Sequence, residues 1–202
     1  MSRWNALPDV WKASFKQATE AYLNSGSVPI GAVVVDERGR IVARGRNGLA
    51  HDRLAHAEIE ALSAIPSATD RSKCEIYCTL EPCLMCVGAI RLSQLRAVHC
   101  AALDPAAGGA EFFDANEFMR AFPCSMHAPS SPELELVVVA LVAEFRHRTD
   151  HSRWREHWVR YHPIGAELGS SLSKANAYHQ WVSSSISAEQ LYEQVAGLHR
   201  AA

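Results

Sequence analysis

The sequence predicts an α/β fold of three layers, α/β/α, in which a mixed sheet of five strands is covered by helices on both faces. Short apolar runs of strand length alternate along the chain with longer segments of helical periodicity, and turn signals separate the two. The strand-like runs are residues 28–36, 40–45, 75–80, 96–102 and 133–143. The helical patterns are residues 8–24, 56–65 and 82–92.

Local signals place the ends of these elements. Pro8 suits position N1 of the first helix, and Gly26 is a stop signal after it. The turn sequence Asp36-Glu37-Arg38-Gly39 predicts that the first two strands form a hairpin. Pro66 ends the second helix, and Pro82 begins the third directly after a strand.

Composition indicates an ordinary globular protein. The chain has 202 residues, of which 48% are hydrophobic and 21% charged, so we expect a sizeable core. No apolar run is long enough to span a bilayer, and the N-terminal stretch lacks the apolar core of a signal peptide. We therefore expect a cytoplasmic protein with no membrane contact. Its six cysteines do not indicate disulfides in that compartment.

The formal net charge of −2 bears on the class of partner. Proteins that bind nucleic acid usually carry a basic domain or stripe, because neutralising phosphates supplies most of their affinity. This chain has no such overall bias, although one segment concentrates six basic residues: Arg146, His147, Arg148, Arg153, Arg155 and Arg160. That segment is either a solvated helix face or a local contact for RNA, and we favour the solvated face.

The stretch from His56 to Cys86 carries the chemistry. It begins with His56-Ala57-Glu58 and ends with Pro82-Cys83-Leu84-Met85-Cys86. One imidazole and two thiolates are three protein ligands for Zn²⁺, and they leave the fourth tetrahedral position to water, as in catalytic sites. The two cysteines fall in the first turn of a helix, where the partial positive charge favours thiolates. The sequence therefore predicts a catalytic zinc site at His56, Cys83 and Cys86.

Glu58 lies two residues after the predicted histidine ligand and is not itself needed as a ligand. Zinc lowers the pKa of a bound water to about 7, so hydroxide can form at neutral pH. A carboxylate beside it can take the proton and pass it to the substrate. We expect Glu58 to be this general acid and base, and a coincidental pair of cysteines would not explain its position.

Together the two motifs resemble the signature of the zinc-dependent cytidine deaminase superfamily, H-x-E followed by P-C-x-x-C. The runs Val28 to Val35 and Thr79-Leu80-Glu81 add to a likeness that covers roughly residues 8–160. It is greatest to bacterial tRNA adenosine deaminases and guanine deaminases. The resemblance implies a cytidine deaminase-like fold, a zinc cofactor and a homodimer.

The resemblance also implies residues that contact the substrate. Asn47 matches an asparagine that touches the sugar or base, and its amide offers both a donor and an acceptor. The backbone near Ala57 and the carbonyl groups around Glu81 are expected to hold the ring. Without the resemblance, Asn47 is equally well a turn residue beside Gly48.

The loop after the fourth strand is expected to choose the substrate. Asp104-Pro105-Ala106-Ala107-Gly108-Gly109 resembles the family loop but lacks the lysine and threonine usual in tRNA adenosine deaminases. Glu111-Phe112-Phe113-Asp114 is more similar to guanine deaminases, in which an aspartate here can contact the purine. Asp114 could accept from purine N–H groups, and Phe113 could stack on the base. Equally, Asp114 could cap a helix over 115–122.

The C-terminal part differs in composition from the rest. Trp154, Trp158 and Tyr161 recur at helical spacing and predict a packed stripe. A C-terminal aromatic reaches an active site in guanine deaminases, sometimes that of the partner subunit, so the resemblance makes Tyr161 a candidate for this role.

Glycines and serines within residues 165–173 predict a linker after the deaminase domain. Two short helices should follow at 175–184 and 188–198, the second with Ser187 as its N-cap. We therefore divide the chain into a zinc-dependent deaminase domain, residues 1–162, and a C-terminal helical extension, residues 163–202.

The function predicted from the sequence is zinc-dependent hydrolytic deamination of a nucleobase or nucleoside, with release of ammonia. The slight acidity and the Phe113-Asp114 pair favour a small purine substrate such as guanine, adenine or adenosine. The run from Thr79 to Cys86 favours the alternative of a tRNA-specific adenosine-to-inosine deaminase. A third possibility is a catalytically silent, zinc-folded subunit that helps a partner deaminase. Such a subunit is expected to lack the catalytic glutamate, whereas Glu58 is present.

Overall fold

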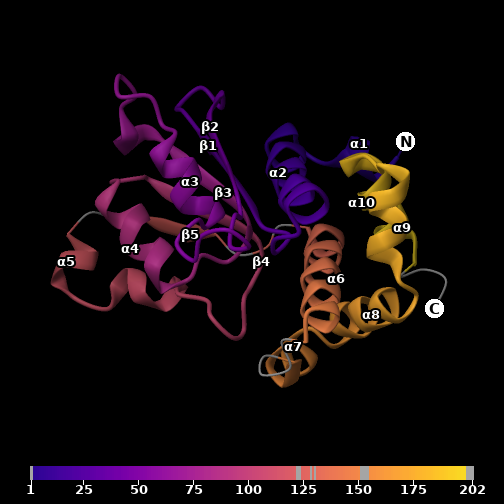
Figure 1. The fold of residues 1–202 in the computed structure, drawn as a ribbon. Helices are drawn as coiled ribbons and strands as arrows, with labels where there is room; N and C mark the ends of the chain where they lie inside the picture. Colours follow the sequence, from indigo (N-terminus) through magenta and orange to yellow (C-terminus); the bar gives the residue numbers. More distant parts are fainter. Residues whose placement is uncertain (1, 122–123, 128, 130, 151–154, 199–202) are drawn as a thin grey trace.

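The computed structural model describes residues 2–121, 124–127, 129, 131–150 and 155–198, and a five-stranded mixed sheet forms its centre (Figure 1). The strand order is β2-β1-β3-β4-β5. The strands are β1 (Gly31–Val35), β2 (Ile41–Arg46), β3 (Glu75–Leu80), β4 (Ala97–Ala102) and β5 (Ser125–His127). β1 pairs antiparallel with β2 and β3, whereas β4 is parallel to β3 and β5.

Helices cover both faces of the sheet, so the predicted three-layer fold is confirmed. In Figure 1, α3 (Ala57–Ser63) and α4 (Leu84–Leu92) lie on one face, and α2 (Asp9–Ser25) and α6 (Pro132–Arg148) lie on the other. Two hydrophobic clusters fill the two interfaces. All five residues of β1 are buried, as expected for a strand covered on both sides.

The remaining helices are short. They are α1 (Arg3–Ala6), α5 (Glu117–Arg120), α7 (Arg155–Tyr161), α8 (Pro163–Lys174), α9 (Ala177–Ser184) and α10 (Ala188–Leu198), with 3₁₀ turns η1 (Arg71–Lys73) and η2 (Ala110–Asp114). In Figure 1, α8 to α10 lie outside α6 and α2 and add helices beyond the third layer. No helix in the described residues is long and apolar enough to cross a bilayer.

The predicted stop at Gly26 and the predicted hairpin turn are confirmed, whereas α3 ends at Ser63, before Pro66, and α4 begins at Leu84, two residues after Pro82. Gly26 ends α2 in the left-handed conformation, with φ of 61°. The hairpin turn is held by Asp36, whose Oδ1 accepts hydrogen bonds from the backbone N–H groups of Arg38 and Arg40 at 2.9 and 3.0 Å. Pro8 is the N-cap of α2 and not its N1 residue. The helix therefore begins at Asp9, one residue later than predicted.

The prediction of a fifth strand at 133–143 is wrong, because these residues form most of α6. Ser131 caps the helix by accepting a hydrogen bond from the Leu134 N–H at 3.2 Å, and Pro132 follows it. Residues 137 to 144 are all buried, so α6 has no polar stripe that would reveal a helical period. The fifth strand is Ser125–His127, which is too short to stand out in the sequence.

The predicted linker at 165–173 is also wrong, because this stretch is the middle of α8. Its glycines allow α8 to lie directly against α6. A Cβ at Gly169 would lie 2.5 Å from Ala143 Cβ, and one at Gly165 would lie 2.5 Å from Val139 Cγ1. Glycine is therefore used here for close helix packing and not for flexibility.

The two later helices agree with the prediction. α9 and α10 span Ala177–Ser184 and Ala188–Leu198. Ser187 Oγ accepts from the Gln190 N–H at 3.2 Å, while Gln190 Oε1 accepts from the Ser187 N–H at 2.9 Å, which is a capping box. Leu191 and Tyr192 of α10 belong to the same hydrophobic cluster as Phe15 of α2, so the extension packs on the α2–α6 side.

Candidate active site

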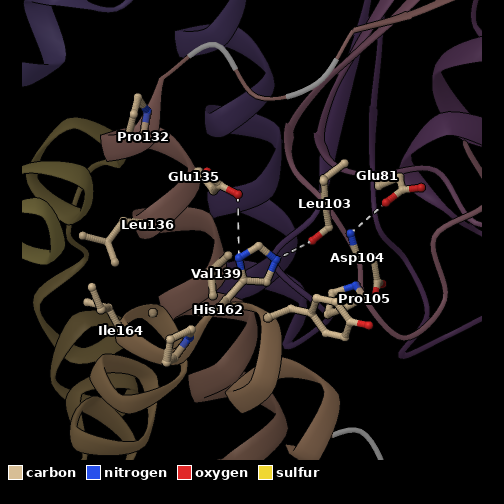
Figure 2. A pocket seen from close by; sticks show the side chains of 13 residues that line it. Glu81, Leu103, Asp104, Pro105, Pro132, Glu135, Leu136, Val139, His162 and Ile164 are labelled. Atoms are coloured by element: carbon tan, nitrogen blue, oxygen red, sulfur yellow. Dashed lines mark hydrogen bonds and ion pairs between the residues drawn. The ribbon is translucent and has the colours of Figure 1, made fainter.

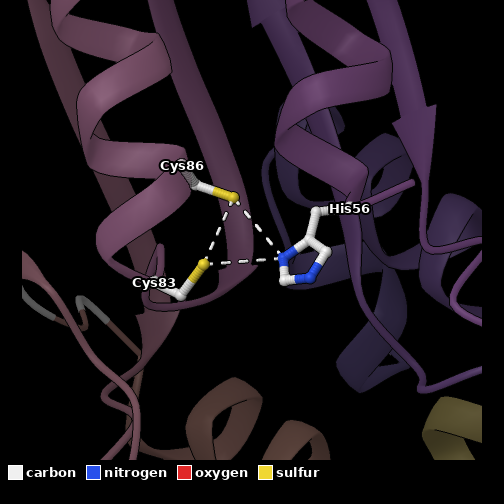
Figure 3. A group of neighbouring side chains, drawn as sticks. All are labelled: His56, Cys83 and Cys86. Atoms are coloured by element: carbon white, nitrogen blue, oxygen red, sulfur yellow. Dashed lines mark hydrogen bonds between the residues drawn. The ribbon is translucent and has the colours of Figure 1, made fainter. Parts of the chain in front are cut away.

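Two helix starts bring the predicted metal ligands together. His56 is the N-cap of α3 and Cys83 the N-cap of α4, and Cys86 is the third residue of α4. Figure 3 shows the three side chains pointing toward one another from these two helices. His56 Nδ1 lies 3.6 Å from Cys83 Sγ and 3.5 Å from Cys86 Sγ, and the two sulfurs are 3.6 Å apart.

The triangle of donor atoms fits a zinc ion. Zinc bonds of about 2.3 Å to sulfur and about 2.0 Å to nitrogen, at the tetrahedral angle, place sulfurs about 3.8 Å apart and nitrogen about 3.5 Å from sulfur. The observed edges of 3.5 and 3.6 Å match these lengths closely. Within the part of the chain that the structure describes, this is the one group of three or more His, Cys, Asp or Glu residues that could hold a metal ion.

Proton sharing inside the triangle favours a thiolate at Cys83. The hydrogen bond with Cys86 lowers the pKa of Cys83 to about 4, and a hydrogen bond with His56 acts in the same direction. The hydrogen bond with Cys83 raises the pKa of His56, and the same Cys83 contact together with burial raises the pKa of Cys86. Because metal ligands must be deprotonated, Zn²⁺ binding releases the proton that Cys86 retains.

Glu58 lies beside this cluster on the first turn of α3. Its side chain is buried, and Oε2 lies 3.4 Å from Cys86 Sγ. Burial raises the pKa of Glu58, and the negative charge of Cys83 acts in the same direction. Since Glu58 is not one of the three clustered ligands, its carboxyl group is left to hold or release a proton next to the metal site.

Glu81 connects the metal site to the loop after β4. Its Oε2 accepts from the Asp104 N–H at 3.0 Å, and its Oε1 accepts from the Ala110 N–H at 2.9 Å. A Cβ at Gly108 would lie 2.4 Å from this carboxylate, so a side chain there would displace Glu81 from the loop. Both carboxylate oxygens thus bind the loop, which the sequence alone did not reveal.

Asn47 and Ala57 are both buried near the start of the motif. Asn47 follows β2, and its Oδ1 accepts a hydrogen bond from the Leu49 N–H at 3.0 Å. This hydrogen bond is typical of a turn residue, the alternative role that the sequence gave for Asn47. Ala57 is the first residue of α3, where a helix leaves its backbone N–H without an intrahelical acceptor.

Phe113 and Asp114 both lie in η2, but Phe113 is buried and Asp114 is exposed. Phe113 is 7% exposed and belongs to the hydrophobic cluster under α3 and α4. Asp114 is exposed, and its backbone carbonyl accepts from Arg120 Nη1 at 2.8 Å. Asp114 does not cap α5, because that cap is Asn116, whose Oδ1 accepts from the Met119 N–H at 3.0 Å. Residue 122, the end of the predicted helix, lies outside the described residues.

Tyr161 is placed at a cavity of about 570 Å³ that also includes Glu81 in its lining. Figure 2 shows this cavity between the loop Leu103–Pro105, the first turns of α6 and the start of α8. His162 spans it, with Nε2 3.1 Å from the Leu103 carbonyl oxygen and Nδ1 3.7 Å from Glu135 Oε1. Trp158 is buried as expected for a packed stripe, but Tyr161 is 59% exposed, so that part of the prediction is wrong, and Trp154 lies outside the described residues.

The basic segment is not a uniform solvated face. Arg148 is largely buried, bonds Glu144 at 3.2 Å and lies 3.6 Å from the centre of the Tyr178 ring. Arg146 is largely buried too, whereas Arg155 and Arg160 are exposed, and Arg153 lies outside the described residues. Because Arg148 is engaged with Glu144 and Tyr178, the described part of the segment does not present one continuous basic face.

This geometry defines a class of protein before any comparison. An N/S₂ ligand set at two helix starts, with a buried and unligated glutamate, is the arrangement of a zinc-dependent hydrolytic deaminase. The model of the "cytidine and deoxycytidylate deaminase zinc-binding region" matches residues 7–102. A tRNA-specific adenosine deaminase of Rickettsia bellii is 38% identical over 106 residues, which are 50% of this chain and 72% of that protein.

Two further comparisons agree. A guanine deaminase of Bacillus subtilis is 38% identical over 91 residues, or 43% of this chain and 58% of that protein. A solved structure from a study of A-to-I editing by tRNA:A34 deaminases has 31% identity and a TM-score of 0.53 over 59% of this chain and 96% of that one. The chain belongs to the cytidine and deoxycytidylate deaminase zinc-binding family, zinc is its cofactor, and its activity is hydrolytic deamination of a nucleobase or nucleoside.

Proposed function

We propose that the protein hydrolyses the exocyclic amino group of a purine, as the free base or in a small molecule that contains it, to a carbonyl group with release of ammonia. The observation that carries this proposal is the buried carboxyl group of Glu58, 3.4 Å from one sulfur of the three-atom ligand cluster. A purine is favoured because relatives named for guanine and for adenosine share that ring system.

Each residue of the cluster has a defined task. His56, Cys83 and Cys86 hold Zn²⁺, which supplies Lewis acidity that makes water a nucleophile at neutral pH. Glu58 takes a proton from the attacking water at its carboxylate and donates it to the ring nitrogen beside the reacting carbon. It then takes the second proton from the hydroxyl group newly bonded to that carbon and donates it to the amino group, which leaves as ammonia. The raised pKa of Glu58 suits this task, because the group must both accept and return a proton.

Substrate contacts follow from the buried groups near the cluster. The Asn47 amide and the backbone N–H of Ala57 orient the ring, since each offers a hydrogen-bonding group close to His56 in the chain. Glu81 acts through the backbone carbonyl groups next to it, because its carboxylate is bound to the loop. Phe113 shapes the wall of the site from the core, and Asp114 is an exposed acceptor at its edge.

A tRNA substrate is the second candidate, and the relatives named as tRNA-specific adenosine deaminases favour it. Against it stands the absence of basic residues from residues 104–109, together with the buried ion pair that engages Arg148 with Glu144. Binding to an anticodon stem-loop that falls steeply with salt would support tRNA, and no binding at low salt would exclude it.

The cellular setting that we propose is purine metabolism in the cytoplasm, in a homodimer. Large apolar side chains beside the ligands support the dimer, because Leu54, Leu84 and Met85 are 63%, 57% and 36% exposed. Residues 1–162 would form the deaminase domain, and residues 163–202 a helical extension that packs on it. The silent-subunit alternative is disfavoured by the presence and placement of Glu58.

The test is an ammonia-release screen of the purified zinc protein. Guanine, adenine, cytosine, their nucleosides and nucleoside monophosphates, and a tRNA anticodon stem-loop should each be offered, with Glu58→Gln protein as the blank. Ammonia release from a purine substrate that requires Glu58 is the expected result. Release from cytosine compounds alone would overturn the purine proposal, and no release from any compound would favour the silent-subunit reading.

A further inference from the structure

A second cavity, of about 540 Å³, lies beside the loop that connects Asn47 to His56. Its wall is formed by the turn after α2, that connecting loop and the last turn of α6, and the lining residues are Gly26, Ser27, Val28, Leu49, Ala50, Arg53, Phe145 and Arg146. Ser27 Oγ accepts from the Ala50 N–H at 3.0 Å, and Asn47 accepts from the Leu49 N–H. The wall is therefore joined directly to a residue proposed to orient the substrate.

The charge of this cavity is opposite to that of the chain. Among the described residues that line it, Arg53 and Arg146 are cationic and none is acidic. The whole chain has a formal net charge of −2, so this pairing of two arginines does not follow from overall composition. A cavity with guanidinium groups and no lining carboxylate favours an anionic ligand.

Arg146 has hydrogen-bonding capacity that its neighbours do not use. Its side chain is 19% exposed, and its one ion pair among the described residues is with Asp104 Oδ2 at 3.9 Å. Charge-assisted hydrogen bonds are shorter, about 2.7–2.9 Å, so this pair is loose. The other oxygen of Asp104 accepts from the backbone N–H groups of Ala106 and Ala107 at 2.9 and 3.1 Å, which fixes the carboxylate to its own loop.

The surroundings hold Arg146 in place without neutralising it. Its guanidinium carbon lies 5.2 Å from the centre of the buried Trp158 ring. Burial lowers the pKa of Arg146, against the opposing effect of Asp104, so the charged form lacks full compensation in this environment. A guanidinium group has five N–H donors in a planar fork, which suits two oxygens of one anion. The group is thus oriented in advance for an oxyanion.

Arg53 provides the second cation at an exposed position. It lies three residues before His56, in the same loop that forms the wall. An extended chain spans at most about 3.6 Å per residue, so Arg53 Cα lies no more than about 11 Å from His56 Cα. An anion held between Arg53 and Arg146 would then be close enough for a small molecule to extend from it toward His56. The volume of about 540 Å³ is within the range of small-molecule sites, about 300–1,000 Å³.

We propose that this cavity binds the phosphate group of the substrate through Arg53 and Arg146, so that the purine is deaminated as a nucleoside monophosphate. The inference rests on the proposed function and names the substrate class for it. Free bases and nucleosides react more slowly because they lack the anchoring group, and binding energy from a remote phosphate helps to orient the ring at Glu58.

A binding experiment tests the subsite without any turnover. Ribose 5-phosphate and ribose are titrated separately into the zinc protein by isothermal calorimetry. Two charge-assisted hydrogen bonds, at about 1.5 kcal/mol or more each, predict that ribose 5-phosphate binds at least about a hundredfold more tightly than ribose. Arg53→Gln and Arg146→Lys should each remove most of that difference, whereas Arg38→Gln, on the exposed hairpin turn, should keep it. Equal binding of the two sugars, or full retention of the difference in Arg53→Gln, would overturn the proposal.

Arg53 is exposed, so its substitution should leave the fold intact even if the buried Arg146 variant fails to fold. Equal melting temperatures and zinc contents of Arg53→Gln and wild type check this. If the Arg146 variant is unfolded, the Arg53 result alone decides between the outcomes above.

A turnover experiment separates the two sources of phosphate. The ratio of kcat/KM for a purine nucleoside 5′-monophosphate to that for its nucleoside should be about tenfold or more, and should fall in Arg53→Gln. A ratio near one together with rapid reaction of an anticodon stem-loop would assign the cavity to an RNA phosphodiester and overturn the mononucleotide. If ribose 5-phosphate binds but no purine compound releases ammonia, the proposed function fails and the anion subsite remains.

Discussion

The two halves of the molecule are built in different ways. Residues 31–102 contain all three donor atoms of the metal cluster, and each ligand belongs to a short local motif at the start of a helix. The region after residue 102 owes its features to contacts between distant segments, such as Glu81 with Ala110 and Arg146 with Asp104. The family match also ends at residue 102. The metal ligands thus come from short local motifs, whereas the loop and helices after residue 102 are held by contacts between segments that are distant in the sequence.

The largest expected effect is loss of the metal. Cys86→Ala should reduce zinc from one ion per chain to a small fraction and abolish deamination, because two remaining donors hold zinc poorly. Cys124→Ala is the matched control, since Cys124 is a half-buried thiol outside the cluster. Zinc is counted by plasma mass spectrometry on the purified proteins. Full zinc content in Cys86→Ala would show that the metal site lies elsewhere.

Glu58→Gln should separate catalysis from metal binding. Glutamine keeps the shape of the side chain but cannot exchange a proton, so kcat should fall by about 10²–10⁴ while zinc remains bound. Glu60→Gln, an exposed carboxyl group on the same helix, should retain wild-type kcat. Steady-state kinetics on the substrate found in the ammonia screen provide the measurement. An unchanged kcat in Glu58→Gln would remove the proton carrier from the account.

In the second half, packing should matter more than chemistry. Gly169→Ala places a Cβ within 2.7 Å of Ala143 Cβ, the Ala140 carbonyl oxygen and the Glu144 nitrogen. The α6–α8 contact should loosen, and the free energy of unfolding should fall by about 1–3 kcal/mol in denaturant titrations. Gly197→Ala in α10 meets only Arg3 Nη1, at 3.9 Å, and should cause no loss. Equal stabilities for the two variants would show that α8 does not depend on this close contact.

The smallest effect is expected at the cap of α10. Ser187→Ala removes the acceptor for the Gln190 N–H and should lower the free energy of unfolding by about 1 kcal/mol. Ser183→Ala is the control, because Ser183 is an exposed residue inside α9 whose hydroxyl donates only to the His179 carbonyl oxygen. Thermal melting of both variants should show a decrease in Ser187→Ala alone. An equal decrease in both would mean that the cap adds nothing specific.

Sequence reasoning succeeded where a residue type has one dominant physical role. The H-x-E and P-C-x-x-C motifs, the hairpin turn at Asp36 and the left-handed Gly26 belong to this group. It failed at α6, because a helix buried on all sides has the same apolar run as a strand. It failed at α8, because glycine used for close packing looks the same in a sequence as glycine in a linker.

The residues proposed to contact the substrate were the hardest to assign from the sequence. The carboxylate of Glu81 could be assigned to a loop only after residues 104 and 110 were seen beside it. Phe113 offered an aromatic ring for stacking, yet its ring is part of the core. Arg146 belonged to a basic segment that we expected on a solvated face, whereas its side chain is largely buried and its ion pair with Asp104 is loose.

The central claim is a zinc ion held by His56, Cys83 and Cys86, with Glu58 free beside it. X-ray absorption at the zinc edge of the purified protein tests this most directly. The account predicts two sulfurs at about 2.3 Å and two lighter atoms at about 2.0 Å, with the same shell in wild type and Glu58→Gln. A third sulfur, or a shell that changes when Glu58 is replaced, would contradict it.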